Sequence, residues 1–158
     1  MEINIILAGV GGQGILTTAQ AICLAALRRG LRVKQAEVHG MSQRGGAVES
    51  HLRVADHELY SDLIPLGKAD MILAVEPMEA LRYVQFLSEN GVIIASSNPV
   101  VNIPNYGSVE TVRDRVFERD DAYVAELGFD DLESRTGLPS MNAVLSTIST
   151  VYFVVSFT

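Results

Sequence analysis

Two glycine-rich segments carry the residue types that could do chemistry in this 158-residue chain. In the first, residues 9–14 (GVGGQG), the glycines have the spacing of a turn that leads from a strand into a helix. Backbone amides and the positive end of the helix dipole could meet a phosphate there. The second, residues 39–46 (HGMSQRGG), places an imidazole, a hydroxyl, an amide and a guanidinium in one polar loop hinged by glycines. Its Arg44 could present a planar fork to a carboxylate or a phosphate.

The elements around these segments are predicted to form a βαβ unit. Residues 3–8 are a short apolar run typical of a buried parallel strand, and residues 31–38 are expected to be the next strand. Between them, residues 14–29 repeat apolar side chains at three- and four-residue spacing, which predicts an amphipathic helix. Both glycine-rich segments should therefore emerge at one edge of a doubly wound sheet, where such sheets bind their ligands. The predicted ligand- or partner-binding residues are Gly9, Gly11, Gly12, Gln13, Gly14, His39, Gln43, Arg44, Gly45 and Gly46.

The middle of the chain adds strands and one helix. Residues 47–54 alternate apolar and polar side chains, which suits a strand at a sheet edge or an interface, and residues 58–61 could pair with it as a hairpin. Residues 71–75 predict a buried strand and residues 78–87 a helix. A turn at Asn90-Gly91 then leads into a strand over residues 92–95.

The last third of the chain is expected to be helical, over residues 110–118, over residues 121–127 and from Leu138 onward. The fold class is therefore α/β and Rossmann-like: a mostly parallel sheet with helices on both faces, in a single domain over residues 1–158. Residues 151–157 are apolar and β-prone. They are either a buried last strand or the sign of a C-terminus that is truncated or atypical from about residue 146.

Composition excludes several classes of function. With 12 basic and 19 acidic side chains the formal charge is −7, which argues against nucleic-acid binding. Cys23 is the single cysteine, so one chain cannot hold an iron–sulfur cluster or a cysteine-rich zinc site. Neither His51 nor His57 has metal-ligand spacing, so no metal site is predicted. The sequence shows no Ser-His-Asp or Cys-His arrangement, so no catalytic residue is predicted. The N-terminus lacks a leader pattern and the C-terminal run is far below the roughly 20 apolar residues of a membrane span, so a cytoplasmic location without a membrane role is expected.

The glycine turn leaves alternatives open. Glu37, near the end of the second strand, could hold the ribose of a dinucleotide, which would make the chain a free-standing NAD(P)-binding oxidoreductase or a nucleotide-sensing module. The chain continues for two residues before Gly40, however, so Glu37 is not the last residue of that strand. The glycines could also serve only to let helix and sheet approach closely, and residues 39–46 could be a plain surface loop.

Three segments together resemble the gamma-type subunit of the 2-oxoacid:ferredoxin oxidoreductases. They are residues 9–15 (GVGGQGI), 37–46 (EVHGMSQRGG) and 76–82 (EPMEALR). The HGMSQRGG form of the loop is most similar to the small (beta) subunit of indolepyruvate:ferredoxin oxidoreductase. The resemblance extends over about residues 3–145 and implies one gamma-type domain.

The resemblance implies the oxidative decarboxylation of an arylpyruvate with coenzyme A, which passes two electrons to ferredoxin. Thiamine diphosphate and 4Fe–4S clusters would belong to a large partner subunit, and this chain would bind no cofactor alone and be inactive alone. Its glycine turn would face the partner or a coenzyme A phosphate, with His39, Gln43 and Arg44 as polar contacts beside it. Relatives usually continue with further helical residues, so a missing terminal helix would expose apolar surface and favour a homodimer of the isolated chain.

Overall fold

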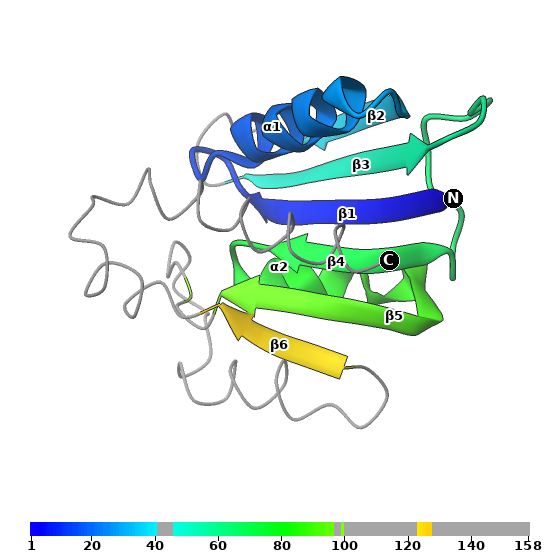
Figure 1. Ribbon diagram of the computed structural model, residues 1–158. Helices are drawn as coiled ribbons and strands as arrows, with labels where there is room; N and C mark the ends of the chain where they lie inside the picture. Colours follow the sequence, from blue (N-terminus) through cyan, green and yellow to red (C-terminus); the bar gives the residue numbers. More distant parts are fainter. Residues whose placement is uncertain (41–45, 97–98, 100–122, 128–158) are drawn as a thin grey trace.

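The computed structural model describes residues 1–40, 46–96, 99 and 123–127. The expected helix over residues 110–118, the helix from Leu138 and the unusual C-terminal run lie outside these residues. The described part is one six-stranded sheet of order β2-β3-β1-β4-β5-β6 with two helices (Figure 1). The elements are β1 (Glu2–Val10), α1 (Ile15–Arg28), β2 (Arg32–His39), β3 (Ala47–Ala55), β4 (Ala69–Ala74), α2 (Pro77–Arg82), the 3-10 turn η1 (Val84–Phe86), β5 (Leu87–Ser96) and β6 (Tyr123–Leu127).

The sheet is mixed rather than mostly parallel, because β3 runs against both of its neighbours. The pairings of β1 with β4, β4 with β5 and β5 with β6 are parallel, whereas β3 pairs antiparallel with β1 along its full length and with β2 over Val48–Ala55. The connection from His39 to Ala47 is too short for the crossover of a dozen or more residues that a parallel neighbour needs, so β3 must turn back beside β2. As a result β2 is not adjacent to β1.

Residues 47–54, expected at a sheet edge or an interface, do not lie at an edge of the sheet. This strand is interior, and β2 is the edge strand of the sheet. Burial follows position, since Ser50, His51 and Leu52 are all at most 3% exposed. The alternating pattern identified the strand but not its place in the sheet, because polar His51 is buried against Ile64 and Phe86 and does not face water.

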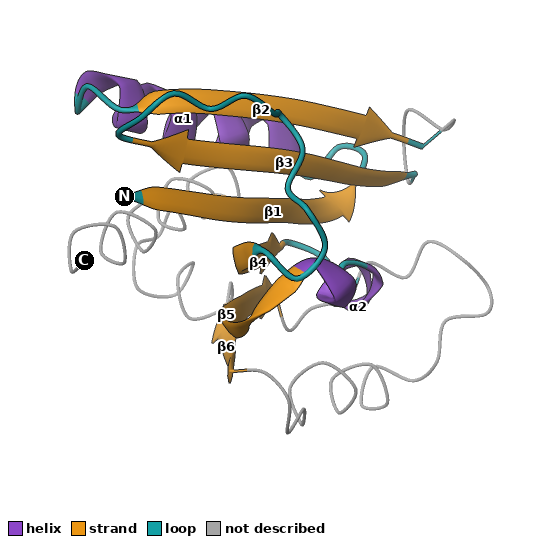
Figure 2. Cartoon of the chain, turned by 90° about the vertical axis from the view of Figure 1, so that its right-hand side faces the viewer, coloured by secondary structure: helices purple, strands orange, loops and turns teal. Residues whose placement is uncertain are grey.

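The α/β arrangement with helices on both faces is confirmed (Figure 2). One face of β1 packs Ile5 and Leu7 against Ile15 and Ile22 of α1. The other face packs residues such as Ile6 against the layer that contains α2. Full burial of an isoleucine or leucine side chain contributes about 1.5–3 kcal/mol, so the alternating side chains of β1 contribute to holding both layers to the sheet.

Three further predictions were wrong. Residues 58–61 form no strand and belong to the connection between β3 and β4. The helix expected over residues 78–87 ends at Arg82, and β5 begins at Leu87, so that Asn90-Gly91 lies inside a strand. Residues 123–127 are the strand β6 and not a helix, because they pair with the edge that β5 would otherwise leave open.

Candidate functional site

The carboxyl ends of β1 and β4 form the switch point of this sheet. These two neighbouring parallel strands send their following helices to opposite faces, α1 to one and α2 to the other (Figures 1 and 2). In open α/β sheets, ligands bind outside the carboxyl ends of the strands where the connections diverge in this way. The switch point is defined here as residues 9–14, which follow β1, and residues 75–77, which follow β4.

The turn after β1 is held by hydrogen bonds within it and depends on glycine at two positions. Gly12 has φ 100° and Gly14 has φ 79°, both in the left-handed region that other residues rarely adopt. The Gln13 side-chain oxygen accepts a hydrogen bond from the Val10 amide at 2.8 Å, and the Gln13 amide donates to the Val10 carbonyl at 3.2 Å. The carbonyl end of the Gln13 side chain therefore serves the turn itself.

Gly9 and Gly12 have different roles within this turn. A Cβ atom on Gly9 would lie 2.6 Å from Val75 Cγ2 and 2.8 Å from Ile15 Cδ1, so this glycine permits the close approach of β1, β4 and α1. A Cβ atom on Gly12 would meet no atom within 4 Å. The turn thus combines a packing glycine with an open one, and only the open one leaves room for another molecule.

The helix that follows is ready for an anion. Gly14 is the N-cap of α1, no side-chain hydrogen bond caps this end, and the first turn contains no acidic residue. The Thr18 amide and hydroxyl both donate to the Gly14 carbonyl, at 2.9 and 3.1 Å. The positive end of the helix dipole is left without a compensating charge from its own first turn, which favours an anionic group there.

The second glycine-rich segment starts and ends beside the first. The Gly11 amide donates to the Gly46 carbonyl at 2.8 Å, and the Gly40 amide donates to the Ala47 carbonyl at 2.8 Å. In the sheet, Gly9 and His39 are both register partners of Val48. The ends of the two predicted segments therefore share one edge, although Gln43, Arg44 and Gly45 lie outside the described residues.

Glu37 is badly placed to hold a ribose. Because β3 lies between β2 and β1, the strand of Glu37 is two strand spacings, roughly 9–10 Å, from the glycine turn. Its carboxylate already accepts a hydrogen bond from Gln35 Nε2 at 2.6 Å and lies 3.3 Å from His39 Nε2. This geometry argues against the dinucleotide alternative.

The other side of the switch point was not among the predicted site residues. The Val75 amide donates to the Ala8 carbonyl at 3.0 Å, which extends the β1–β4 ladder to the edge. Glu76 is 1% exposed and caps α2 by accepting from the Glu79 amide at 2.9 Å, with Pro77 at the first helical position. The sequence signal that could have identified residues 75–77 as part of the site is a capping residue followed by proline, with a second acid three residues after the cap.

Glu79 is buried with one oxygen unsatisfied. It is 5% exposed, its Oε1 lies 3.0 Å from Arg82 Nε, and its Oε2 is buried with no hydrogen-bond partner among the described residues. Burial raises the pKa of the Glu79 carboxyl, while Arg82 opposes the rise and Glu76 adds to it. A perturbed, buried carboxyl next to a switch point is a feature that often accompanies functional sites.

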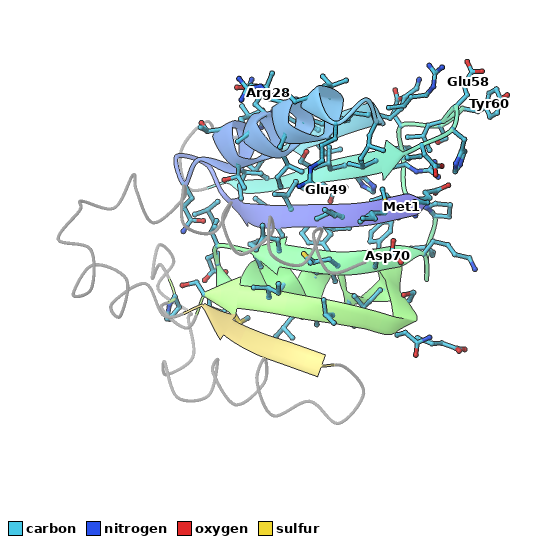
Figure 3. The ribbon with its side chains drawn as sticks, viewed as in Figure 1. Met1, Arg28, Glu49, Glu58, Tyr60 and Asp70 are labelled. Atoms are coloured by element: carbon cyan, nitrogen blue, oxygen red, sulfur yellow. The ribbon has the colours of Figure 1, made fainter. Side chains whose placement is uncertain are left out.

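A series of hydrogen-bonded polar side chains, His51, Glu49 and Tyr83, connects β3 to the segment that follows β4. His51 Nδ1 accepts from the Ile64 amide at 3.1 Å, so the ring proton lies on Nε2, which donates to Glu49 Oε1 at 3.1 Å. Burial, followed by the charge of Glu49 and a hydrogen bond to it, raises the pKa of Tyr83. His51 is a core histidine, and Glu49, labelled in Figure 3, connects it to Tyr83, the residue that follows α2.

No helix among the described residues is both long and apolar enough to cross a membrane. Fold and switch point together define an α/β protein with an anion-ready glycine turn. Residues 4–151 match the model of the pyruvate ferredoxin/flavodoxin oxidoreductase family, and the chain belongs to this family.

Curated relatives share substantial identity over part of their length. Subunit IorB of indolepyruvate oxidoreductase from Archaeoglobus fulgidus is 50% identical over 101 residues, which are 64% of this chain and 49% of the relative. The IorB subunit from Pyrococcus horikoshii is 42% identical over 125 residues, 75% of this chain and 61% of the relative. The chain therefore spans about half to three-fifths of the length of these relatives.

Solved structures share the fold. The pyruvate oxidoreductase subunit PORC from Thermotoga maritima superposes with a TM-score of 0.61 at 19% identity, over 90% of this chain and 72% of that one. The 2-oxoglutarate:ferredoxin oxidoreductase from Magnetococcus marinus, solved with 2-oxoglutarate, coenzyme A and succinyl-CoA bound, gives 0.65 at 15% identity over 90% of this chain and 22% of that one.

Proposed function

We propose that this chain is the small subunit of a 2-oxoacid:ferredoxin oxidoreductase that acts on indolepyruvate or another arylpyruvate. The observation that carries the proposal is the 50% identity to an IorB subunit, in a chain of the matching family. The reaction converts the oxoacid anion and coenzyme A into acyl-CoA, CO2, one proton and two electrons, which ferredoxin accepts. The chain is inactive alone and works in the cytoplasm as part of the complex.

We place thiamine diphosphate and the 4Fe–4S clusters in a large partner subunit, where they would supply the decarboxylation chemistry and the path for the electrons. The described residues do not fit an iron–sulfur cluster. The single thiol, Cys23, is half-buried and donates to Gln35 Oε1 at 3.5 Å, and burial raises its pKa, so it is a poor ligand for iron. What this chain contributes is a surface at the active site.

At that surface the glycine turn binds a phosphate of coenzyme A or faces the partner. The open backbone at Gly12, the uncompensated N-terminus of α1 and the adjoining ends of residues 39–46 support an anionic ligand. Arg44, His39 and Gln43 are the expected polar contacts to the same ligand. These groups bind and orient it, and none is assigned a bond-making role.

The test is reconstitution under anaerobic conditions. The large subunit, purified without this chain, is mixed with the chain and assayed for ferredoxin reduction with indolepyruvate and coenzyme A. The proposal expects turnover only when both are present. Recovery of the chain alone from its native lysate, with or without bound NAD, together with no effect on the large subunit, would overturn it.

Arg44→Ala tests the phosphate contact in the assembled enzyme. We expect a rise in KM for coenzyme A of about ten- to a hundredfold, the effect of losing one charge-assisted hydrogen bond of about 1.5–3 kcal/mol. Arg28→Ala, an exposed arginine at the far end of α1, is the matched control and should leave KM unchanged. Unchanged kinetics in Arg44→Ala would rule out a direct role.

A further inference from the structure

Glu79 combines two features that a purely structural residue of α2 would not need. Its side chain is buried, and one of its carboxyl oxygens has no partner among the described residues. A buried ionised carboxylate with a free oxygen is far more costly than the neutral acid, because no donor replaces the lost water. An apolar side chain of similar volume would pack α2 at lower cost.

A negative charge on Glu79 is compensated on one oxygen only, by Arg82, whose Nε lies 3.0 Å from Oε1. The layer of the sheet beneath α2 is made of apolar residues of β1, β4 and β5, such as Ala8, Ala74 and Ile93. The one cation at α2 is Arg82, whose side chain is 63% exposed. Among the described residues, the titratable or charged groups that act on Glu79 are Glu76 and Arg82. Those that act on Tyr83, which follows the helix, include Glu49 and Arg82, and His51 is bonded to Glu49.

Glu79 also lies where it can control the switch point. Its amide is the donor that the Glu76 cap accepts, so residues 76 and 79 are tied together at 2.9 Å. Glu76 and Pro77 are the segment that follows β4, and α2 has only six residues. A change at Glu79 is therefore transmitted over a single helical turn to residues 75–77 of the switch point.

We propose that Glu79 is a positioning residue that docks α2 on the sheet as a neutral carboxylic acid, with its proton on Oε2, and that ionisation of this side chain releases the Glu76–Arg82 segment from the sheet. The raised pKa of Glu79, caused first by burial, agrees with this assignment. The inference rests on the switch point and not on which molecule binds there.

The sign of the pH effect follows directly. A carboxyl whose folded pKa is raised stabilises the fold fully below its unfolded pKa of 4.5, and this contribution is lost as the pH rises through the folded pKa. The equilibrium for release of α2 should grow by up to tenfold per pH unit in that window, the limit for one proton. Glu79→Gln, which mimics the neutral acid, should remove this dependence.

The experiment compares the 158-residue chain with its Glu79→Gln and Glu58→Gln variants. Infrared spectra should show a protonated-carboxyl band that persists as the pH is raised above 4.5, the ordinary value for this carboxyl. Glu79→Gln should lack this band and Glu58→Gln should keep it, since Glu58 is exposed and lies in the connection between β3 and β4. Hydrogen exchange of the Glu79 and Ala80 amides, taken as the ratio of wild type to Glu79→Gln at each pH, should rise with pH.

Absence of the band, or a ratio that stays flat with pH, would overturn the inference. If Glu79→Gln fails to fold, Glu79→Leu, which fills a similar volume without a carboxyl, takes its place in both readouts. Neither readout needs coenzyme A or the partner, so a failure here is distinguishable from a failure of the proposed function.

Discussion

The two ends of the sheet differ in whether their polar groups have hydrogen-bond partners. At the end where β1 starts, Arg53 donates to Asn4 Oδ1 at 2.9 Å, to Glu2 Oε1 at 2.6 Å and to the Ser61 carbonyl at 3.0 Å. His57 lies 3.2 Å from the second oxygen of Glu2. We call the residues Glu2, Asn4, Arg53 and His57 the closed end; Met1, Glu58, Tyr60 and Asp70, labelled in Figure 3, lie in the same region.

The switch point, at the other end of the sheet, has polar groups without hydrogen-bond partners among the described residues. It has an uncapped helix N-terminus and an open glycine turn. On α2, next to residues 75–77, Glu79 has a carboxyl oxygen without a partner among the described residues. Polar groups that already bond to one another gain no hydrogen bond from a ligand, whereas unsatisfied donors and acceptors gain one when a ligand binds. The difference assigns stability to the closed end and binding to the switch point.

The largest expected effect is that of Gly9→Val. The first side-chain atom alone would lie 2.6 Å from Val75, so β1, β4 and α1 must move apart. We expect a loss of about 3 kcal/mol in the free energy of unfolding, measured with urea, and loss of activity in the reconstituted enzyme. A variant that keeps both would show that the packing of the switch point is not needed.

Arg53→Met should separate stability from binding. The Arg53 side chain is 13% exposed, and its removal leaves partners of the closed end without a donor, so we expect a loss of about 2 kcal/mol in unfolding free energy. KM for coenzyme A in the assembled enzyme should not change. A raised KM at unchanged assembly would mean that the closed end also contributes to binding.

Gly12→Ala and Gly67→Ala form a matched pair. Both glycines have positive φ, at 100° and 69°, and neither has an atom within 4 Å of an added Cβ. Each substitution should cost about 1 kcal/mol of stability through backbone strain. Only Gly12→Ala should weaken coenzyme A binding, measured by calorimetry on the assembled enzyme. Equal binding in the two variants would remove the turn from the site.

The smallest effect is on the pH dependence of the closed end. Hydrogen bonding from Arg53, then from Asn4, lowers the pKa of Glu2 below its usual value of 4.5. A lowered folded pKa gives stability that is present above 4.5 and lost as the pH falls through the folded value, the opposite sign to Glu79. Glu2→Gln should flatten the acid side of the stability profile in thermal unfolding, and Glu58→Gln should not. An unchanged acid side would mean that Glu2 is not part of the stabilising network.

Local signals were enough for the features that depend on neighbouring residues. The apolar run of β1, the glycine spacing and the periodicity of α1 predicted a strand, a turn and a helix, and the shared sheet edge followed from them. The resemblance carried by residues 9–15, 37–46 and 76–82 led to the right family.

Features set by distant pairings could not be predicted in this way. No local pattern shows that β3 inserts between β2 and β1, since register with β1 joins residues as far apart as Glu2 and Ala55. That insertion turns Glu37 away from the site and buries His51. Glu79 was missed for a related reason: its burial depends on α2 packing over the central strands, while its sequence context looks like a solvated helix.

Hydrogen exchange of this chain, free and assembled with its large subunit, tests the central claim most directly. The account predicts that assembly slows exchange of the amides over residues 10–17 and 75–79, with further protection when coenzyme A is added, and leaves residues 53–66 unchanged. Protection confined to residues 53–66 would contradict it, because binding would then belong to the closed end and not to the switch point.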